Sequence, residues 1–218
     1  MTTDSSTGGY LSPTLPATEL YDDALEDFLH DLVVGITGLD PTMVRPRWQP
    51  ETPILPDANG PGIGMGPFGS GGFGAQPWAA IGVINRTPDA YSYVAHTAGT
   101  SGSPATPGFD TEYRSEILTV QLSFYGPSAE SLTAQFCMGL KIAQNREQLM
   151  KLNYPLVNTD VPVNVPELIQ ERWVFRTDLT FRVRHMAQYQ YAVLDVASAQ
   201  AIAETDTALN EQITVTEP

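Results

Sequence analysis

Two long segments in which apolar and polar residues alternate constrain the fold of this chain more than any other feature. Residues 116–126 read Glu-Ile-Leu-Thr-Val-Gln-Leu-Ser-Phe-Tyr-Gly, with an apolar side chain at every second position from Leu118 to Phe124. Residues 171–184 repeat the alternation over a greater length. A period of two is typical of a strand that buries one face. Both segments are therefore predicted to be strands, over residues 111–125 and 167–186.

Two other segments show the spacing of apolar residues that is typical of helices. In residues 18–34, Thr18 is suited to cap the N-terminus, and the helix is expected to end near Gly35 or Gly38, before Pro41. Residues 128–150 are predicted to form one helix, which begins after Gly126 and Pro127 end the first long strand. The apolar face of this helix is expected to contain Leu132, Phe136, Leu140 and Ala143.

Shorter strands and long loops account for the rest of the chain. Strands are predicted at residues 43–49 and 191–196, and two more, 78–85 and 91–97, are predicted to form a hairpin with a turn around Thr87-Pro88-Asp89. We expect three parts: a flexible arm (1–17), a single domain (18–190) with a long glycine-rich loop (57–77), and an acidic C-terminal extension (191–218).

Charge is spread unevenly along the chain, whose net charge is −14. The first 40 residues carry eight acids and no Lys or Arg, and five more acids follow Arg184 without any Lys or Arg. Such acidity argues against tight nucleic-acid binding, which requires cations to replace the counterions of phosphate. The single cysteine, Cys137, excludes an intramolecular disulfide and is expected to be a buried, inert thiol. No signal peptide and no membrane span are predicted.

Motifs that would indicate catalysis or a cofactor fail on their context. Residues 64–69 match GxGxxG, but no strand precedes them and no helix follows. The histidines His30, His96 and His185 lack the spacing of metal ligands, and each is expected at the surface or at a strand end. Ser101 does not lie in a nucleophile elbow. The sequence therefore predicts no catalytic residue, no cofactor and no metal site, and the chain is not expected to be an enzyme.

The arginines of the second long strand have two interpretations. The alternation places Arg172, Arg176, Arg182 and Arg184 on one face with Val174, Asp178 and Thr180, opposite Trp173, Phe175, Thr177, Leu179, Phe181 and Val183. This face is either an ordinary solvent-exposed face, or a contact with acids of a neighbouring subunit, because Arg pairs bidentately with carboxylates. The acids expected in such a contact lie in the first helix: Asp22, Asp23, Glu26 and Asp27.

Together, residues 116–126, the helix 128–150, residues 171–181 and the acidic N-terminal helix resemble the neck or tail-terminator proteins of tailed bacteriophages, over residues 18–190. The resemblance implies an α+β fold, in which two main helices pack on a mixed, mostly antiparallel sheet with long Gly/Pro-rich loops. It implies a structural virion protein of the neck, usually a hexameric ring, that terminates the tail tube and joins it to the head-side connector or stopper protein. DNA would pass through the lumen without specific binding. In the glycine-rich loop, Met65, Phe68 and Phe73 are the expected partner contacts.

Two alternative functions remain open beside this interpretation. The first is a head-completion or stopper ring of the same neck, which sequence patterns barely separate from a terminator. The second, of another class, is a ligand- or glycan-binding β domain of a tail or baseplate component, with the glycine-rich loops as binding loops.

Overall fold

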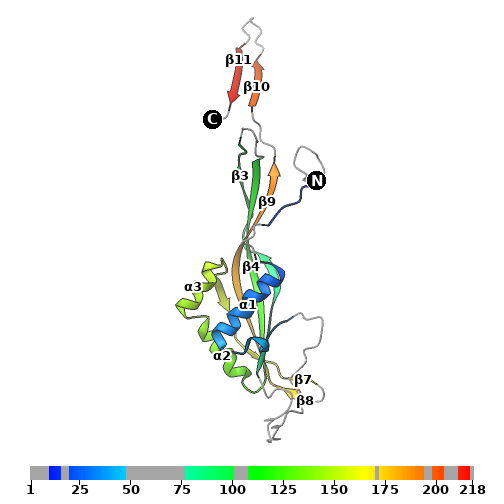
Figure 1. Cartoon of the computed structure of the whole chain (residues 1–218), viewed down its shortest axis with the longest axis vertical. Coiled ribbons are helices and arrows are strands. Elements are labelled where there is room, and N and C mark those ends of the chain that lie inside the picture. The colour runs from blue at the N-terminus through cyan, green and yellow to red at the C-terminus, as the bar shows by residue number, and fades with distance from the viewer. Residues whose placement is uncertain are drawn as a thin grey trace. The chain divides into compact units, whose positions relative to one another are not determined.

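The structure of the chain is a computed structural model, which describes residues 10–15, 20–47, 77–100, 108–169, 172–193, 198–203 and 211–216 (Figure 1). The chain forms two compact units, one made of residues 1–19, 92–114 and 187–218 and the other of residues 20–91 and 115–186. The division predicted from the sequence, into an arm (1–17), a single domain (18–190) and a C-terminal extension (191–218), stays a prediction.

The main sheet has its strands in the order β1-β2-β4-β9-β5. The parallel neighbours β1 and β2 start the sheet, β2 runs antiparallel to β4, and β5 runs antiparallel to β9. The bounds of these strands are Val44–Pro46 (β1), Trp78–Pro88 (β2), Gly108–Tyr125 (β4), Arg176–Val193 (β9) and Leu156–Thr159 (β5). A short strand, β6 (Val163–Asn164), also pairs with β9. The predicted α+β class with a mixed, mostly antiparallel sheet is confirmed.

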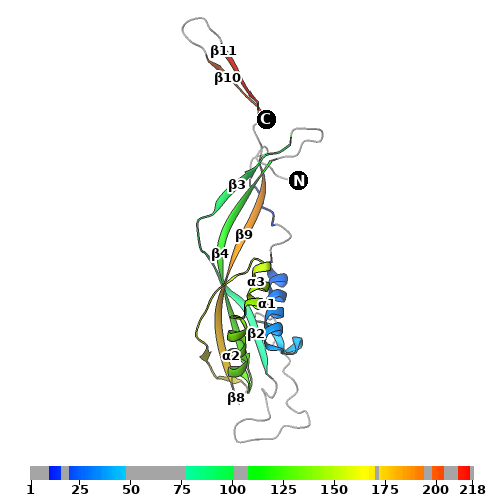
Figure 2. The same cartoon turned by 90° about the vertical axis from the view of Figure 1, so that its left-hand side faces the viewer.

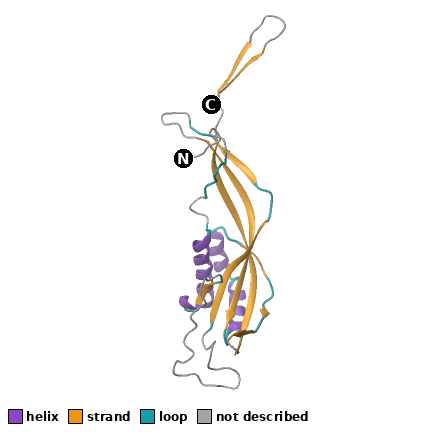
Figure 3. Ribbon diagram, turned by 90° about the vertical axis from the view of Figure 1, so that its right-hand side faces the viewer, coloured by secondary structure: helices purple, strands orange, loops and turns teal. Residues whose placement is uncertain are grey.

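Three helices of the larger unit lie against one face of the sheet (Figure 3). They are α1 (Asp22–Thr37), α2 (Ala129–Gly139) and α3 (Ala143–Lys151). Leu29 of α1, Phe136 of α2 and Leu149 of α3 are almost fully buried in one core with Leu118 and Phe181 of the sheet. The alternation predicted for β4 and β9 thus supplies one wall of this core, and the apolar stripes of the helices supply the other.

The helix α1 buries residues four apart, Leu25, Leu29 and Val33, as its sequence spacing predicts. It ends at Gly38, which has a φ of 69° and donates its N–H to the carbonyl of Val34. A left-handed residue at this position favours glycine, so the second of the two predicted ends is confirmed. The helix begins at Asp22, later than predicted, and Thr18 lies outside the described residues.

The prediction of one helix over residues 128–150 is wrong, because α2 ends at Gly139 and α3 begins at Ala143. Residues 140–142 form a turn in which Asn145 donates from its side-chain amide to the carbonyl of Gly139 at 2.9 Å. The turn redirects the chain, so that Ala143, expected on the apolar face, is exposed. Leu132, Phe136 and Leu140 are buried as predicted.

Two glycines of these helices are expected to respond to alanine in opposite ways. A Cβ on Gly139 would clash with Cγ2 of Ile36, whereas a Cβ on Gly35 would meet no atom within 4 Å. Because the β-branched Ile36 is stiff, Gly139→Ala is expected to lower the free energy of unfolding by about 1–3 kcal/mol. Gly35→Ala is expected to raise it by about 0.5–1 kcal/mol, since alanine favours a helix interior. Urea denaturation measures both, and equal effects of the two substitutions would contradict the close approach of α1 and α2.

The predicted hairpin between β2 and the next strand, β3 (Tyr93–Thr97), is wrong. Both strands pair antiparallel with β4 instead, β2 with residues 116–125 and β3 with residues 109–113. At 18 residues, β4 is long enough to pair with both strands. Chain reversal therefore falls between Thr97 and Gly108 and not at residues 87–89. In the smaller unit, β3, β4 and the end of β9 lie side by side (Figure 2).

The second long strand begins later than predicted. Residues 167–186 contain β7 (Glu167–Ile169) and β8 (Arg172–Val174), which form a separate antiparallel pair, before β9 begins at Arg176. The alternation from Thr177 to Val183 is confirmed by burial, but Trp173 and Phe175, placed on the same face, are exposed. At this point the buried residue is Val174, on the opposite face from the one predicted, because it packs with Ala80 and Tyr125 in a small second cluster outside the main core.

The end of the chain contains more regular structure than predicted. Strand β9 continues to Val193, and residues Ser198–Ala203 (β10) and Glu211–Thr216 (β11) pair antiparallel with each other. The predicted last strand over residues 191–196 is thus the end of β9 as far as Val193. The pairing of β10 with β11 was not predicted, because the acidic residues of this region hide the short apolar alternation of Gln212 to Val215.

Candidate assembly surfaces

Arg176, the first residue of β9, is held by two acids of its own chain. Its Nε and Nη2 donate to the two carboxylate oxygens of Asp178 at 2.7 and 2.9 Å, and its Nη1 donates to Glu167 at 3.0 Å. The side chains of Arg176 and Asp178 are each only 16% exposed. Gln121 of β4 also donates to Asp178, at 3.3 Å. These contacts join β9 to β7 and β4 on the face of the sheet that the helices leave uncovered.

Aromatic rings cover the inner side of this charged cluster. The guanidinium of Arg176 lies 5.5 Å from the ring centre of Tyr125, which stacks on Trp78 at 3.9 Å. Burial raises the pKa of the Tyr125 hydroxyl, so this phenol stays neutral at ordinary pH. Burial alone would lower the pKa of Arg176, but its hydrogen bonds with Asp178 and Glu167 outweigh that effect and raise it. Arg176 therefore keeps its positive charge between the carboxylates of Asp178 and Glu167.

Two further arginines of β9 also have acids within the chain. Arg182 donates to both carboxylate oxygens of Asp160, at 2.7 and 3.1 Å. The Nε of Arg184 lies 2.8 Å from Asp89, and the Arg184 side chain is 50% exposed. The side chain of Arg172 lies outside the described residues. The described side chains, those of Arg176, Arg182 and Arg184, lie on one face of β9, and each already has a carboxylate beside it. The role of the predicted arginines between subunits stays a prediction.

The acids predicted to meet these arginines lie on α1. Asp22, Asp23 and Asp27 are exposed, and Glu26 is half-buried. Within the described part of the chain, none of the four takes part in an ion pair. Met65, Phe68 and Phe73, predicted to contact partners, lie outside the described residues.

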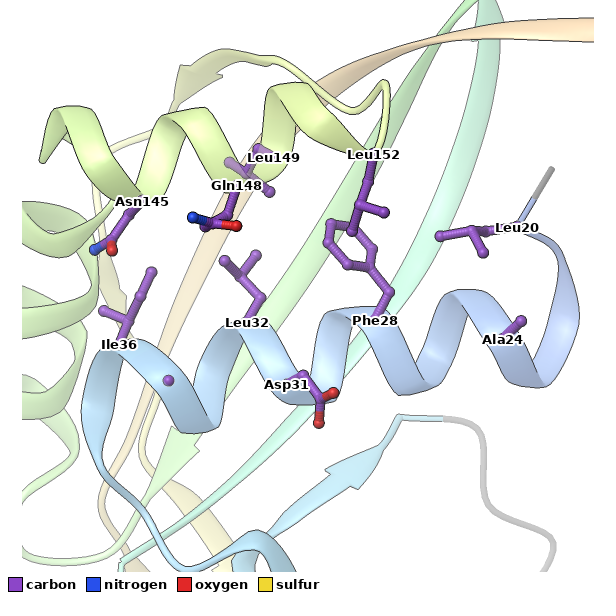
Figure 4. A pocket seen from close by; sticks show the side chains of 11 residues that line it. Leu20, Ala24, Phe28, Asp31, Leu32, Ile36, Asn145, Gln148, Leu149 and Leu152 are labelled. Atoms are coloured by element: carbon purple, nitrogen blue, oxygen red, sulfur yellow. The ribbon is translucent and has the colours of Figure 1, made fainter. Parts of the chain in front are cut away.

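An apolar groove between α1 and α3 was not predicted from the sequence. It has a volume of about 450 Å³, and the close-up shows Phe28 and Leu32 of α1 pointing toward α3, whereas Asp31 points away from it (Figure 4). Its apolar walls are formed mainly by Ala24, Phe28, Leu32 and Ile36 of α1, by Leu149 of α3 and by Leu152, which directly follows α3. The sequence of α1 indicates such a surface, because its apolar residues extend beyond the buried Leu25, Leu29 and Val33. The groove does not follow from a single helix over residues 128–150, since it requires a separate α3 beside α1.

Of the residues tested for chemistry, Ser101 lies outside the described residues, whereas the three histidines and Cys137 lie within them. His30 donates from Nε2 to the carbonyl of Pro41 at 2.9 Å, and His96 lies exposed beside Asp110. His185 was expected at the surface or at a strand end, but β9 continues past it, and it is buried with its ring stacked on Tyr154. Cys137 is half-buried, and burial raises the pKa of its thiol.

Among the described residues, no group of three or more His, Cys, Asp or Glu side chains is arranged to hold a metal ion. None of the described helices combines the length and the apolar character that a membrane crossing requires.

Comparison with known proteins identifies a family. The model of the family described as "Phage neck terminator protein" matches residues 23–211, which include α1, the main sheet and most of the C-terminal segment. No curated protein matches the chain in sequence. The family match supports a structural protein of the virion neck, which contacts other phage head or tail proteins. Because the match covers most of the sequence, the chain belongs to the phage neck terminator protein family.

Proposed function

We propose that the chain forms a ring, hexameric as the family resemblance implies, at the top of the phage tail. In this role it terminates the tail tube, joins it to the head-side connector or stopper protein, and lets DNA pass through its lumen. The match to phage neck terminator proteins over residues 23–211 is the observation that carries this proposal. The proposed role is structural and involves no catalysis.

The charge of the chain agrees with a passage for DNA. The net charge is −14, and like charge disfavours adhesion of a polyanion to a surface. We therefore expect the inner surface of the ring to be acidic or neutral. A map of the electrostatic potential of the assembled ring checks this point, and a strongly basic lumen would contradict it.

The family description favours a terminator over the head-completion or stopper ring of the same neck. The alternative, a ligand- or glycan-binding domain of a tail or baseplate component, gains no support from the groove between α1 and α3. This groove is open and mostly apolar, whereas glycans are commonly held by hydrogen bonds around a few aromatic rings.

Assembly of the purified chain tests the proposal directly. Multi-angle light scattering is expected to give a mass near a multiple of 23.7 kDa that corresponds to a closed ring, and negative-stain images are expected to show particles with an axial hole. Phages that lack the protein are expected to carry tail tubes of irregular length, because nothing would stop tube polymerisation. A monomer at all concentrations, together with tubes of normal length in its absence, would overturn the proposed function.

A further inference from the structure

The groove between α1 and α3 has the shape and lining of a site for an amphipathic helix. Its apolar residues on α1, Ala24, Phe28, Leu32 and Ile36, are spaced four apart and extend over about 18 Å of helix axis. Its volume of about 450 Å³ lies within the range of roughly 300–1,000 Å³ that is common for binding pockets. A groove lined along its length by apolar side chains is the surface on which proteins receive the apolar face of a partner helix.

A row of acidic side chains on α1 runs next to this groove, and one of them, Asp31, belongs to its lining. Asp23, Asp27 and Asp31 are also spaced four apart, and they form a row directly beside the row of Ala24, Phe28 and Leu32. Asp31 belongs to the lining itself and lies at the α1 edge (Figure 4). All three carboxylates are exposed, and within the described residues the only ion pair of this row joins Asp31 to the neighbouring His30. Helix α1 has no Lys or Arg that would balance them.

We propose that this groove is the docking site for a basic amphipathic helix of another virion protein. The apolar face of that helix would fill the space between Phe28, Leu32, Leu149 and Leu152, and its Lys or Arg residues would pair with the row of Asp23, Asp27 and Asp31. The inference rests on the proposed place of the chain between other virion proteins, and it adds the chemistry by which one of them is recognised.

A second copy of this chain fits the groove less well. Its arginines on β9 are engaged with Asp178, Asp160 and Asp89 of the same chain. Arg86 and Arg114 lie over the rings of Tyr21 and Tyr189. With 25 acids against 11 Lys and Arg, a second copy would bring mainly like charge to the acidic row. Charge complementarity therefore selects a partner with a different, basic sequence.

A designed peptide can stand in for the partner helix. The probe is an 18-residue helical peptide with leucines at i, i+3/i+4 and i+7 positions, Lys and Arg on both flanks, and a fluorescein label. Fluorescence anisotropy with the full chain is expected to show saturable binding that weakens as salt is added, because the charges are exposed. A peptide with the same leucines but Glu in place of Lys and Arg is expected to bind at least tenfold more weakly.

Paired variants separate the groove from the rest of the surface. Leu152→Glu, which places a charge in the groove directly after α3, is expected to weaken binding of the basic peptide at least tenfold. Met150→Glu, within α3 but outside the groove lining, is expected to leave binding unchanged. Leu152 is 48% and Met150 59% exposed, so both variants are expected to fold. The double variant Asp23→Lys with Asp27→Lys is expected to weaken binding about tenfold, and the control Glu130→Lys on α2 is expected to leave it unchanged.

Three outcomes would overturn the inference: no binding of the basic peptide, equal binding of the acidic peptide, or equal effects of the groove variants and their controls. Failure of the basic peptide to bind, combined with a change in assembly mass caused by Leu152→Glu, would instead assign the groove to a second copy. Light scattering without peptide tests the ring separately, so that failure of the ring and failure of the groove are distinguishable.

Discussion

Replacing Phe136 with alanine is expected to lower the free energy of unfolding by about 3–5 kcal/mol. Phe136 is fully buried, and its ring lies 5.7 Å from that of Phe181 on β9 and 6.2 Å from that of Phe124 on β4. The substitution would remove the contact that joins α2 to both long strands and would leave a cavity that the sheet cannot close. Denaturant unfolding, followed by circular dichroism, measures the loss.

Phe175→Ala provides the matched control for this prediction. The same atoms are removed, but Phe175 is 62% exposed. Surface substitutions of this kind usually change the free energy of unfolding by about 0.5 kcal/mol or less. Similar losses for the two variants would show that Phe136 does not hold α2 to the sheet in the way described.

Replacing Arg176 with methionine is expected to lower the free energy of unfolding by about 2–4 kcal/mol, somewhat less than the roughly 3–5 kcal/mol typical of a fully buried ion pair. Methionine keeps much of the apolar stem but leaves the carboxylates of Asp178 and Glu167 close together without a cation. Asp178 is the more affected of the two, because it is mostly buried and accepts two hydrogen bonds from Arg176. Equilibrium unfolding at neutral pH measures the effect.

Arg184→Met is the control for Arg176→Met. Arg184 pairs with one acid and is half exposed, and ion pairs at the surface contribute only about 0–1 kcal/mol. Adding Asp178→Asn to Arg176→Met is expected to recover part of the loss, since it removes the unpaired buried charge. If Arg176→Met costs no more than Arg184→Met, the cluster around Arg176 is not an internal support. A charge reversal at Arg176 therefore tests folding before it tests assembly.

Local patterns in the sequence predicted where helices and strands lie better than they predicted which strands pair and which helices pack together. The end of α1 at Gly38 and the alternation of Thr177 to Val183 depend on neighbouring residues, and both were readable from the sequence. The pairing of β3 with β4 depends on the 18-residue length of β4, which no turn motif near Pro88 reveals. The break after Gly139 lies where Ile36, a residue about a hundred positions away, approaches α2 closely.

The same distinction applies to the candidate surfaces. The alternation along one strand predicts that the arginines of β9 share a face. It does not show that the acids that pair with them belong to the same chain, and the sequence-based prediction placed those acids in another subunit. Asp178 lies two residues after Arg176, on the same face of the strand, so this partner was visible in the sequence. The groove needed α1 and α3 together, and it could be seen only once the chain was known to turn at residues 140–142.

The two compact units are interleaved along the chain. The chain passes from one unit to the other at residues 19/20, 91/92, 114/115 and 186/187, and the last two passages lie within β4 and β9. A single genetic crossover would join the front of one parental gene to the rear of another. Wherever such a crossover falls between residues 20 and 186, it mixes parental sequences in the unit made of residues 1–19, 92–114 and 187–218. The three segments of that unit therefore do not all come from one parent after any single crossover between residues 20 and 186.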